Sequence, residues 1–329
     1  MTAMTAAELN FQNPPPDEPQ WLALAQAVFN SLASRLDDKC GGGLRWQAYI
    51  FLNGYDYKNS ISNGCFFNLG ARLAQYTKNA TYASYAEQSW DWMTSVGFMD
   101  AAYNIYDGAS IDQNCTGVNP VQFSYNAGVF LLGAATMYNY TGGSALWRNR
   151  TESLLNRTLD VFFPNDIGFE AACEGALVYC TVDMFSQKAF LTRWMAATTK
   201  VAPWSYEPIM RRLRTSAQAA AQQCCGGANG RRCGLSWAKR GVWDGTQGVG
   251  QQMAALEVVQ SLLIKQAKET VTNETGGTSQ GNPAAGGTVT VTYVPPDAVT
   301  TADKAGAAIL TVLFVGGLLA MCSYMTFGK

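Results

Sequence analysis

Two adjacent aspartates, Asp37 and Asp38, stand early in the chain in the stretch SRLDDKCGGGLRWQ. A pair of carboxylates is the minimal equipment for cleaving a glycosidic bond, because one attacks the sugar or activates water while the other handles the proton. Here, however, the pair follows the end of an expected helix, where the helix dipole disfavours negative charge, and precedes a run of glycines. We therefore interpret the two aspartates as solvated charges in a loop between helices.

Arg45 and Trp46 offer a guanidinium and a flat apolar face, a common way to hold a sugar ring. Packing of Trp46 into the core is an equally good interpretation. Similar polar and aromatic residues recur where other loops enter helices, in SISNGCFFNLG, NIYDGAS and QFSYNAG. Such loop-to-helix corners are where toroidal glycosidases build their clefts. The candidate substrate-binding residues are Arg45, Trp46, Asn63, Asp107, Gln122, Tyr125 and Asn126.

Several kinds of chemistry are excluded or weakly supported. The chain has no histidine, which removes Ser-His-Asp catalysis, Cys-His catalysis and every His-ligated metal site, and we expect neither a metal nor a cofactor. Gly248 and Gly250 form a Gly-x-Gly that follows no strand, so a nucleotide-binding loop is not expected. Asp183 and Lys188 lie five positions apart, which is not the spacing of a helical ion pair. The net charge of −1, without a basic run, argues against nucleic acid as a partner.

Cysteines and glycosylation sequons indicate the secretory pathway. The nine cysteines are Cys40, Cys65, Cys115, Cys173, Cys180, Cys224, Cys225, Cys233 and Cys322. The last lies in an apolar tail, which leaves an even number, and the short separations make Cys173–Cys180 and Cys225–Cys233 plausible disulfides. The candidate glycosylation sites are Asn79, Asn114, Asn139, Asn149, Asn156 and Asn273, each with threonine two places on.

The N-terminal stretch MTAMTAAELNFQNPPPDEPQ does not fit a secretory signal. It lacks a basic region and an apolar core, and it is typical of the end of a helix that runs into a proline-rich loop. Two explanations are open: the C-terminal apolar segment directs targeting, or the chain lacks its beginning.

Residues 1–268 are predicted to form a helical domain. The segment WLALAQAVFNSLASRL has apolar residues at a 3.6-residue period, and the start of SNGCFFNLGARLAQYT offers Ser62 or Asn63 as an N-cap. About eight helices follow one another with Gly-, Pro- and Asn-rich loops between them, and no alternating strand series competes. Helical pairs recur roughly every 50 residues, which suits an all-α solenoid or a toroid of helical hairpins.

The composition changes after Lys268. Residues 269–304 are rich in Gly, Thr and Pro and are predicted to form a flexible stalk. Residues 305–327 carry no charge and are long enough to span a bilayer. This tail predicts either a membrane helix or the removed tail of a GPI signal. In both cases the helical domain is expected to be tethered outside the cell.

A series of motifs resembles one family. The segments GGGLRWQ, NGYDYKNSISNGCFFNLGARLAQYTKNATYASYAEQSWDW, QFSYNAG, ACEGALVYCTVDMFSQKAFLTRW and GVGQQMAALEVV occur in this order. The chain resembles the fungal mannan endo-1,6-α-mannosidases of glycoside hydrolase family 76, from about Met1 to Ile264. The resemblance implies an (α/α)6 toroid, retaining two-carboxylate chemistry and a substrate with α-1,6-linked mannose, either mannan or the core glycan of GPI-anchored proteins.

The chain departs from the family pattern at its start. The resemblance places the catalytic carboxylates in an Asn-Asp-Asp-Gln segment just before a helix similar to MTAMTAAELNF, so we expect that acid pair upstream of Met1, in an N-terminally incomplete copy. The catalytic role is not transferred to Asp37 and Asp38. The leading hypothesis is a surface hydrolase or transglycosidase in wall biogenesis. The alternatives are an inactive mannan-binding or wall-scaffolding protein and a toroid that acts on another glycan.

Overall fold

The computed structural model describes residues 1–175, 179–239, 241–287 and 300–327, and the chain divides into two compact units, Met1–Thr288 and Val289–Lys329. The helices of the first unit are α1 Thr2–Glu8, α2 Trp21–Ala33, α3 Ser60–Thr77, α4 Ala80–Ser95, α5 Ser124–Tyr140, α6 Ala145–Phe162, α7 Gln187–Val201, α8 Tyr206–Gln222 and α9 Val249–Gln260. Two short strands, β1 Tyr57–Asn59 and β2 Gly108–Ser110, pair antiparallel.

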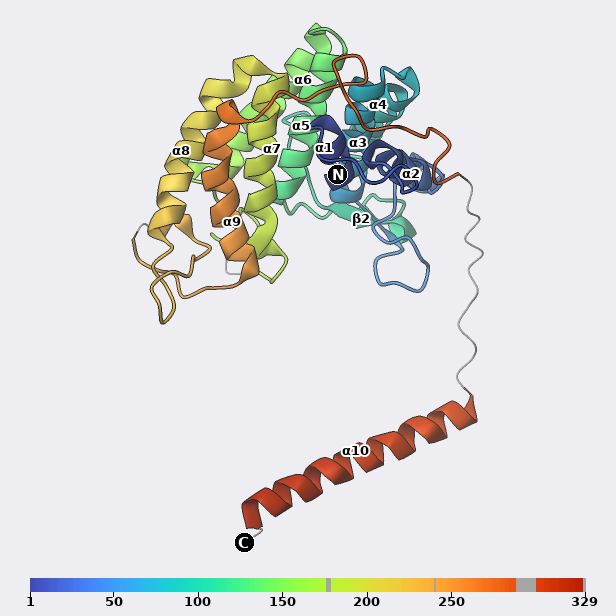
Figure 1. Ribbon diagram of the computed structural model, residues 1–329, viewed down its shortest axis with the longest axis vertical. Helices are drawn as coiled ribbons and strands as arrows, with labels where there is room; N and C mark the ends of the chain where they lie inside the picture. Colours follow the sequence, from blue (N-terminus) through green and yellow to red (C-terminus); the bar gives the residue numbers. More distant parts are fainter. Residues whose placement is uncertain (176–178, 240, 288–299, 328–329) are drawn as a thin grey trace. The chain divides into compact units, whose positions relative to one another are not determined.

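Four helices, α3, α5, α7 and α9, lie side by side and begin at the same end of the domain (Figure 1). We call them the inner helices. They approach closely where glycines face the neighbouring helix: a Cβ at Gly133 would lie 2.4 Å from Phe67 Cε1, and one at Gly128 would lie 3.0 Å from Leu191 Cα. The intervening helices α4, α6 and α8 return the chain to this end, so each inner helix forms a hairpin with an outer one.

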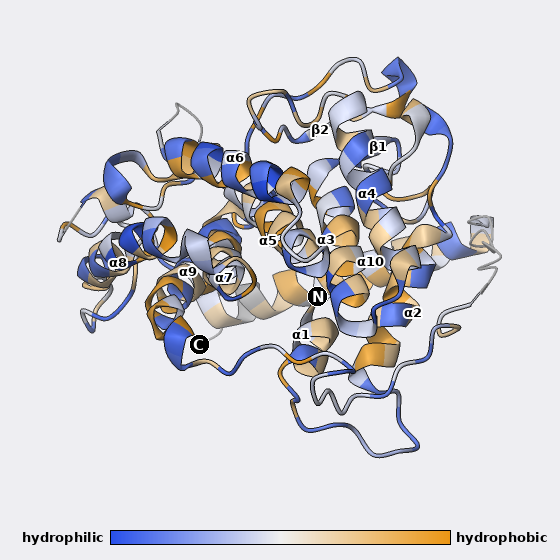
Figure 2. Ribbon diagram, turned by 90° about the horizontal axis from the view of Figure 1, so that it is seen from above, coloured by the Kyte–Doolittle hydropathy of each residue, from blue (hydrophilic) through white to orange (hydrophobic). Residues whose placement is uncertain are grey.

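The core lies between the inner and outer helices. Phe67 stacks with Phe130 at a centroid distance of 5.4 Å, and Trp90 meets Trp147 edge to face at 5.4 Å, with all four rings buried. Figure 2 shows the same division, with hydrophobic residues along α3 and α5 and hydrophilic residues on the outer side of α6 and α8. Burial of large aromatic side chains is the main source of stability in such an arrangement. The prediction of an all-α domain of helical hairpins is confirmed.

Some local predictions were wrong. The N-cap of α3 is Asn59, whose Oδ1 accepts a hydrogen bond from Ser62 N at 3.2 Å, because the chain enters the helix directly from β1. Among the residues that the structure describes, three disulfides form: Cys40–Cys115, Cys173–Cys180 and Cys224–Cys233. Cys224 therefore takes the partner suggested for Cys225, which instead is exposed just after α8 ends.

The segment predicted as the start of a stalk is bound to the helical domain as far as Ala285, whose carbonyl accepts Asn30 Nδ2 at 2.8 Å. Val271 N donates to Glu8 O at 2.8 Å, and Leu22 N donates to Ser279 Oγ at 2.9 Å. Asn282 N donates to Gln26 Oε1 at 2.6 Å. The helical unit thus extends beyond the expected boundary at Lys268. The next part of the predicted stalk, residues 288–299, lies outside the described residues.

The second unit contains α10, Thr301–Phe327. Its stretch Thr301–Met321 is long and apolar enough to cross a membrane, by length and composition alone. The predicted tail, residues 305–327, falls within this helix.

Candidate active-site end of the helical domain

The candidate site lies at the end of the domain where the inner helices begin. Asp107, just before β2, accepts hydrogen bonds from Tyr57 Oη at 2.8 Å and Asn119 Nδ2 at 3.1 Å, both on Oδ2. Its backbone carbonyl accepts Ser60 N, at the start of α3, at 2.8 Å. Burial raises the pKa of Asp107, and the two side-chain hydrogen bonds oppose this shift. Oδ1 has no partner among the described residues, which leaves it able to accept a hydrogen bond from a sugar hydroxyl.

Tyr125, in the first turn of α5, faces several acids. Burial raises the pKa of its phenol, and the nearby carboxyl groups of Asp107, Asp183 and Glu170 raise it further. The phenol therefore keeps its proton across the ordinary pH range and can act as a hydrogen-bond donor. Asp107 and Tyr125, predicted separately from two motifs, thus belong to one part of the molecule.

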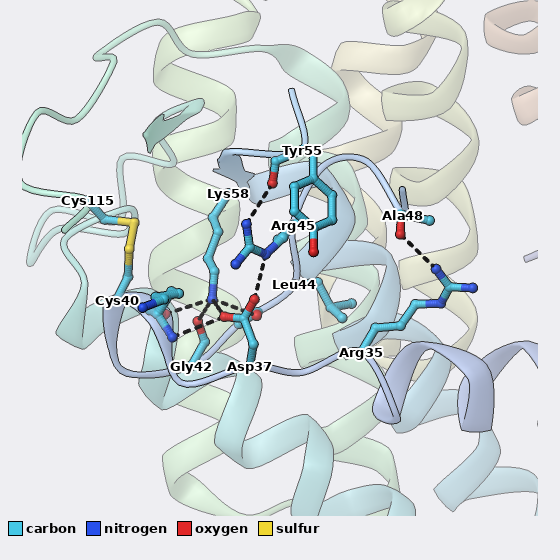
Figure 3. A network of polar contacts seen from close by, with 12 residues as sticks. Arg35, Asp37, Cys40, Gly42, Leu44, Arg45, Ala48, Tyr55, Lys58 and Cys115 are labelled. Atoms are coloured by element: carbon cyan, nitrogen blue, oxygen red, sulfur yellow. Dashed lines mark hydrogen bonds and ion pairs between the residues drawn. A yellow bond between two sulfur atoms is a disulfide. The ribbon is translucent and has the colours of Figure 1, made fainter. Parts of the chain in front are cut away.

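Lys58 in β1 organises the neighbouring loop (Figure 3). Its fully buried ammonium donates to Asp37 Oδ1 at 2.6 Å and to the carbonyls of Lys39, Gly42 and Gly43 at 2.7, 2.5 and 3.0 Å. Burial lowers the pKa of Lys58, and the Asp37 carboxylate offsets part of this effect. A buried cation with so many oxygen partners fixes the course of the glycine-rich loop.

Asp37 also binds Arg45, whose Nε lies 2.6 Å from Asp37 Oδ2. Partial burial opposes ionisation of Asp37, but the hydrogen bonds from Lys58 and Arg45 hold its pKa below the usual value. Our interpretation of this aspartate as a solvated loop charge was wrong, because two cations from β1 and the preceding loop fold back onto it. Asp38, in contrast, is exposed.

Arg45 and Trp46 line an open pocket of about 560 Å³ together with Leu44 and Tyr55. The Arg45 guanidinium lies 4.4 Å from the centre of the Tyr55 ring and donates to the Tyr55 carbonyl at 3.1 Å. Trp46 is 51% exposed, so the alternative that it packs into the core is wrong. A fixed guanidinium beside a half-exposed indole can hold a sugar ring by hydrogen bonding and stacking.

The other three predicted residues occupy different surroundings. Asn63 is buried and clamps the loop, since its side chain accepts Leu44 N at 2.7 Å and donates to Leu44 O at 3.0 Å. Asn126 is fully buried, and its amide has no hydrogen-bond partner among the described residues. Gln122 lines a separate small cavity with Tyr103 and Arg157. These positions favour a supporting role for Asn63, whereas Asn126 and Gln122 lie apart from the Arg45 pocket.

Sequence reasoning missed a second buried network at this end. Glu170 is fully buried and accepts Ser124 N, at the start of α5, at 3.0 Å as well as the Ser124 hydroxyl. Glu174 Oε1 accepts Glu170 N at 2.7 Å and Lys188 Nζ, at the start of α7, at 2.5 Å. Burial raises the pKa of Glu170 to about 7, against the opposing hydrogen bonds from Ser124. The only signal in the sequence was the presence of two glutamates beside Cys173.

The six asparagines of the predicted glycosylation sequons are all exposed. Each therefore lies where an attached glycan would reach solvent without disturbing the core.

Comparison with known proteins identifies the class. The family model described as glycosyl hydrolase family 76 matches residues 1–274. The chain therefore belongs to this family, whose fold is an (α/α)6 toroid, and the inner and outer helices described above are its helical hairpins.

Individual relatives are fungal proteins. The chain is 47% identical over 330 residues to mannan endo-1,6-alpha-mannosidase DCW1 of Saccharomyces cerevisiae, covering 99% of this chain and 73% of the relative. It is 41% identical to the mannan endo-1,6-alpha-mannosidase DFG5 of the same yeast, covering 99% of this chain and 72% of the relative. Dfg5 from Chaetomium thermophilum, solved in complex with glucosamine, superimposes with a TM-score of 0.83 at 50% identity, over 87% of this chain and 71% of that one.

A bacterial structure shares the fold at much lower identity. The α-1,6-mannanase of a Salegentibacter species, in a variant described as inactive and bound to α-1,6-mannotriose, matches with a TM-score of 0.58 at 14% identity, over 72% of this chain and 67% of that one. That variant has two consecutive aspartates changed to asparagine.

Proposed function

We propose that this protein acts on α-1,6-linked mannose, in mannan or in the core glycan of GPI-anchored proteins, as a cell-surface glycosidase or transglycosidase of wall biogenesis. The observation that carries the proposal is the 47% identity to a yeast mannan endo-1,6-alpha-mannosidase over 99% of this chain. The matched family model covers residues 1–274, which is most of the helical unit.

The proposed substrate contacts fall into two groups at the same end of the domain. Trp46 supplies a stacking face, and Arg45 supplies a guanidinium held in place by Asp37. Asp107 accepts a sugar hydroxyl on Oδ1, and Tyr125 donates through its phenol. Asn126 is fully buried and Gln122 lines a separate small cavity, so neither is proposed as a contact of the sugar held at Arg45. We propose that Asn63 positions the loop rather than the sugar.

Asp37 and Asp38 are not proposed as the catalytic pair, although they are the one pair of consecutive aspartates in this sequence. Asp37 is occupied by Lys58 and Arg45, and its lowered pKa makes it a poor proton donor. A retaining mechanism needs one carboxyl that can give and take a proton and another that is free to attack the anomeric carbon.

A hydrolysis assay tests the proposal directly. The protein is incubated with linear α-1,6-mannan and, as a matched control, with β-1,4-mannan, and the products are separated by chromatography. We expect α-1,6-mannooligosaccharides from the first polymer and none from the second. Transfer of the oligosaccharide to an added glucan acceptor would assign a transglycosidase. Retention on α-1,6-mannan without any product would instead favour a mannan-binding protein.

We further propose that the protein is glycosylated at its exposed sequons and held at the outer face of the plasma membrane or in the cell wall through the C-terminal segment. The apolar stretch Thr301–Met321 supports the anchor, and three disulfides support an oxidising compartment. Release of the intact protein from cells by a GPI-specific phospholipase would assign a GPI anchor, whereas resistance to it would assign a membrane helix.

A further inference from the structure

A run of exposed apolar residues projects from the candidate active-site end. Tyr49, Ile50, Phe51 and Leu52 are 38%, 66%, 60% and 39% exposed. Within the described part of the helical unit, no other four consecutive large apolar residues are exposed. Scattered exposed apolar side chains are normal, but a contiguous group marks a surface that contacts another molecule. We call residues 49–52 the apolar tip.

The loop that carries the apolar tip is firmly held at its base. Trp46 N donates to Tyr57 O at 2.7 Å, and the neighbouring residues Arg45 and Lys58 form an antiparallel bridge. The Trp46 ring lies against Gly54, where a Cβ would fall 2.2 Å from Cε3. The loop therefore presents its tip in a fixed shape, and burying the tip costs little ordering entropy.

Contacts within the loop also fix the tip itself. The rings of Tyr49 and Phe51 stack at a centroid distance of 5.5 Å. Arg35 donates from Nη1 to Ala48 O at 3.2 Å, and its guanidinium lies 5.5 Å from the centre of the Tyr49 ring. An aromatic pair flanked by an arginine is typical of side chains at a membrane interface.

The chemistry of the tip favours lipid over sugar. Sugar rings stack on flat aromatic faces, whereas Ile50 and Leu52 offer branched aliphatic surface that suits acyl chains. The charged residues in positions 35–58 are Arg35, Lys39, Arg45 and Lys58 against Asp37, Asp38 and Asp56, a net charge of only +1. Attraction to anionic lipid is therefore weak, and we expect contact through apolar burial, which salt does not remove.

The chain itself brings a bilayer within reach. The described part of the helical unit ends at Gly287, and the stretch able to cross a membrane begins at Thr301. The connecting residues 288–300 can extend to at most about 45 Å, at ~3.5 Å per residue. The covalent connection therefore limits how far a bilayer that anchors the C-terminal segment can be from the helical unit, and such tethering raises the effective concentration of lipid at any apolar loop.

We propose that the apolar tip inserts into the headgroup–acyl boundary of the bilayer that holds α10. The candidate active-site end is then turned toward the membrane surface, where it meets glycans carried on lipid. This inference rests on the proposed membrane attachment through α10. It adds to the proposed function a substrate presented at the bilayer surface.

Photo-crosslinking of the full chain in phosphatidylcholine vesicles tests the proposal. A benzoylphenylalanine replaces Phe51 in one variant and Leu146 in a control, since Leu146 is 55% exposed in the first turn of α6, at the opposite end of the domain. We expect a phospholipid adduct at position 51, undiminished at high salt, and none at position 146. Adding Ile50→Ser to the first variant should lower the adduct yield roughly tenfold, whereas adding Leu256→Ser, at an exposed position on α9, should not.

The contrary outcomes are distinct. A chain that stays in the vesicles after alkaline carbonate but gives no lipid adduct at position 51, or equal adducts at positions 51 and 146, overturns the proposal. So does a crosslink between two copies of the chain, which would assign the tip to a protein interface. Release of the chain by carbonate overturns the attachment through α10 and this inference with it, while leaving the mannan assay unaffected.

Discussion

Lys58 and Lys188 are two fully buried lysines that fasten loops to the same end of the helical domain. Lys58 lies just before α3 and binds Asp37, and Lys188 lies at the start of α7 and binds Glu174. Each ammonium also donates to backbone carbonyls and lies over a tryptophan ring, 5.9 Å from Trp92 or 4.2 Å from Trp237. Each anchored loop also carries a disulfide, since Cys40 of the first is bonded to Cys115 and Cys173–Cys180 closes the second.

We call Lys58, Asp37 and Arg45 the outer network and Lys188, Glu174 and Glu170 the inner network. The two networks differ in their access to water. Asp37 is 29% exposed and shares its charge with Arg45 at the edge of the open pocket. Glu174 is 2% exposed and leads inward to Glu170, which is fully buried. A buried lysine paired with a carboxylate therefore holds the loop of the proposed substrate pocket in one case and an internal polar cluster in the other. The difference in burial goes with opposite pKa shifts: despite partial burial, hydrogen bonds from Lys58 and Arg45 lower the pKa of Asp37, whereas burial raises the pKa of Glu170 to about 7.

The largest expected effect is on the inner network. Lys188→Met removes the partner of a carboxylate that water cannot reach, and the loss should lower the free energy of unfolding by about 4 kcal/mol. Chemical denaturation measures it. Lys200→Met, on the same helix but with an exposed partner in Glu269, should cost less than about 1 kcal/mol. If the double variant Lys188→Met/Glu174→Met is no more stable than Lys188→Met alone, the penalty does not come from an unpaired charge.

The next effect is a loss of stability as the pH rises, which belongs to the inner network alone. Burial raises the pKa of Glu170 from 4.5 to about 7. Below pH 4.5, the pKa of the unfolded chain, the carboxyl is neutral in both states. Between pH 4.5 and about 7 only the unfolded chain ionises, so the free energy of unfolding falls as the pH rises through this interval to the folded pKa. The loss from this group should reach roughly 3 kcal/mol.

Glu170→Gln should remove that slope while keeping the contacts to Ser124. The measurement is the difference in unfolding free energy between wild type and variant at several pH values from 4 to 8, roughly the interval that brackets the two pKa values. Glu207→Gln, at an exposed position of α8, serves as the control and should leave the slope unchanged. Parallel curves for wild type and Glu170→Gln would show that the pKa of Glu170 is the same in the folded and unfolded protein.

The outer network should change the free energy of unfolding with pH in the opposite direction and by a smaller amount. Because the pKa of Asp37 is lowered, its contribution is present at neutral pH and lost as the pH falls through the folded pKa. Asp37→Asn should cost about 2 kcal/mol at neutral pH, since Lys58 keeps its carbonyl partners but loses its counter-charge. Asp38→Asn is the matched control and should change stability by less than about 0.5 kcal/mol. Equal effects of the two substitutions would contradict the assignment.

The helices were predictable because their signal is local. The apolar period in α2 and the glycines after α5 can be recognised from neighbouring residues alone, and both helices form in the structure as predicted. Lys58 and Glu170 carry no such signal, since their partners Asp37 and Ser124 lie 21 and 46 residues away. The segment after Lys268 was taken for a stalk because it has no apolar period of its own. It is held instead by hydrogen bonds to residues of α1 and α2 more than 250 positions earlier.

The candidate site was partly predictable for the same reason. Arg45 and Trp46 share one loop, so their proximity follows from the sequence. The meeting of Asp107 with Tyr57 depends on the pairing of β1 with β2, across 50 residues. Strands of three residues are too short to show a period of two in the sequence. The prediction of an all-helical chain therefore missed the pairing of β1 with β2 that joins these two side chains.

The smallest expected effect tests whether the outer network serves substrate binding. Trp46→Ala should raise KM for α-1,6-mannan roughly tenfold with little change in kcat, because the half-exposed indole contributes stacking that is similar in the ground and transition states. Trp46→Phe should restore most of the affinity by returning an aromatic face. Tyr49→Ala alters the same loop outside the pocket and should leave KM for soluble mannan unchanged. If all three variants raise KM alike, the loop acts through its general shape, and Trp46 is not a sugar contact.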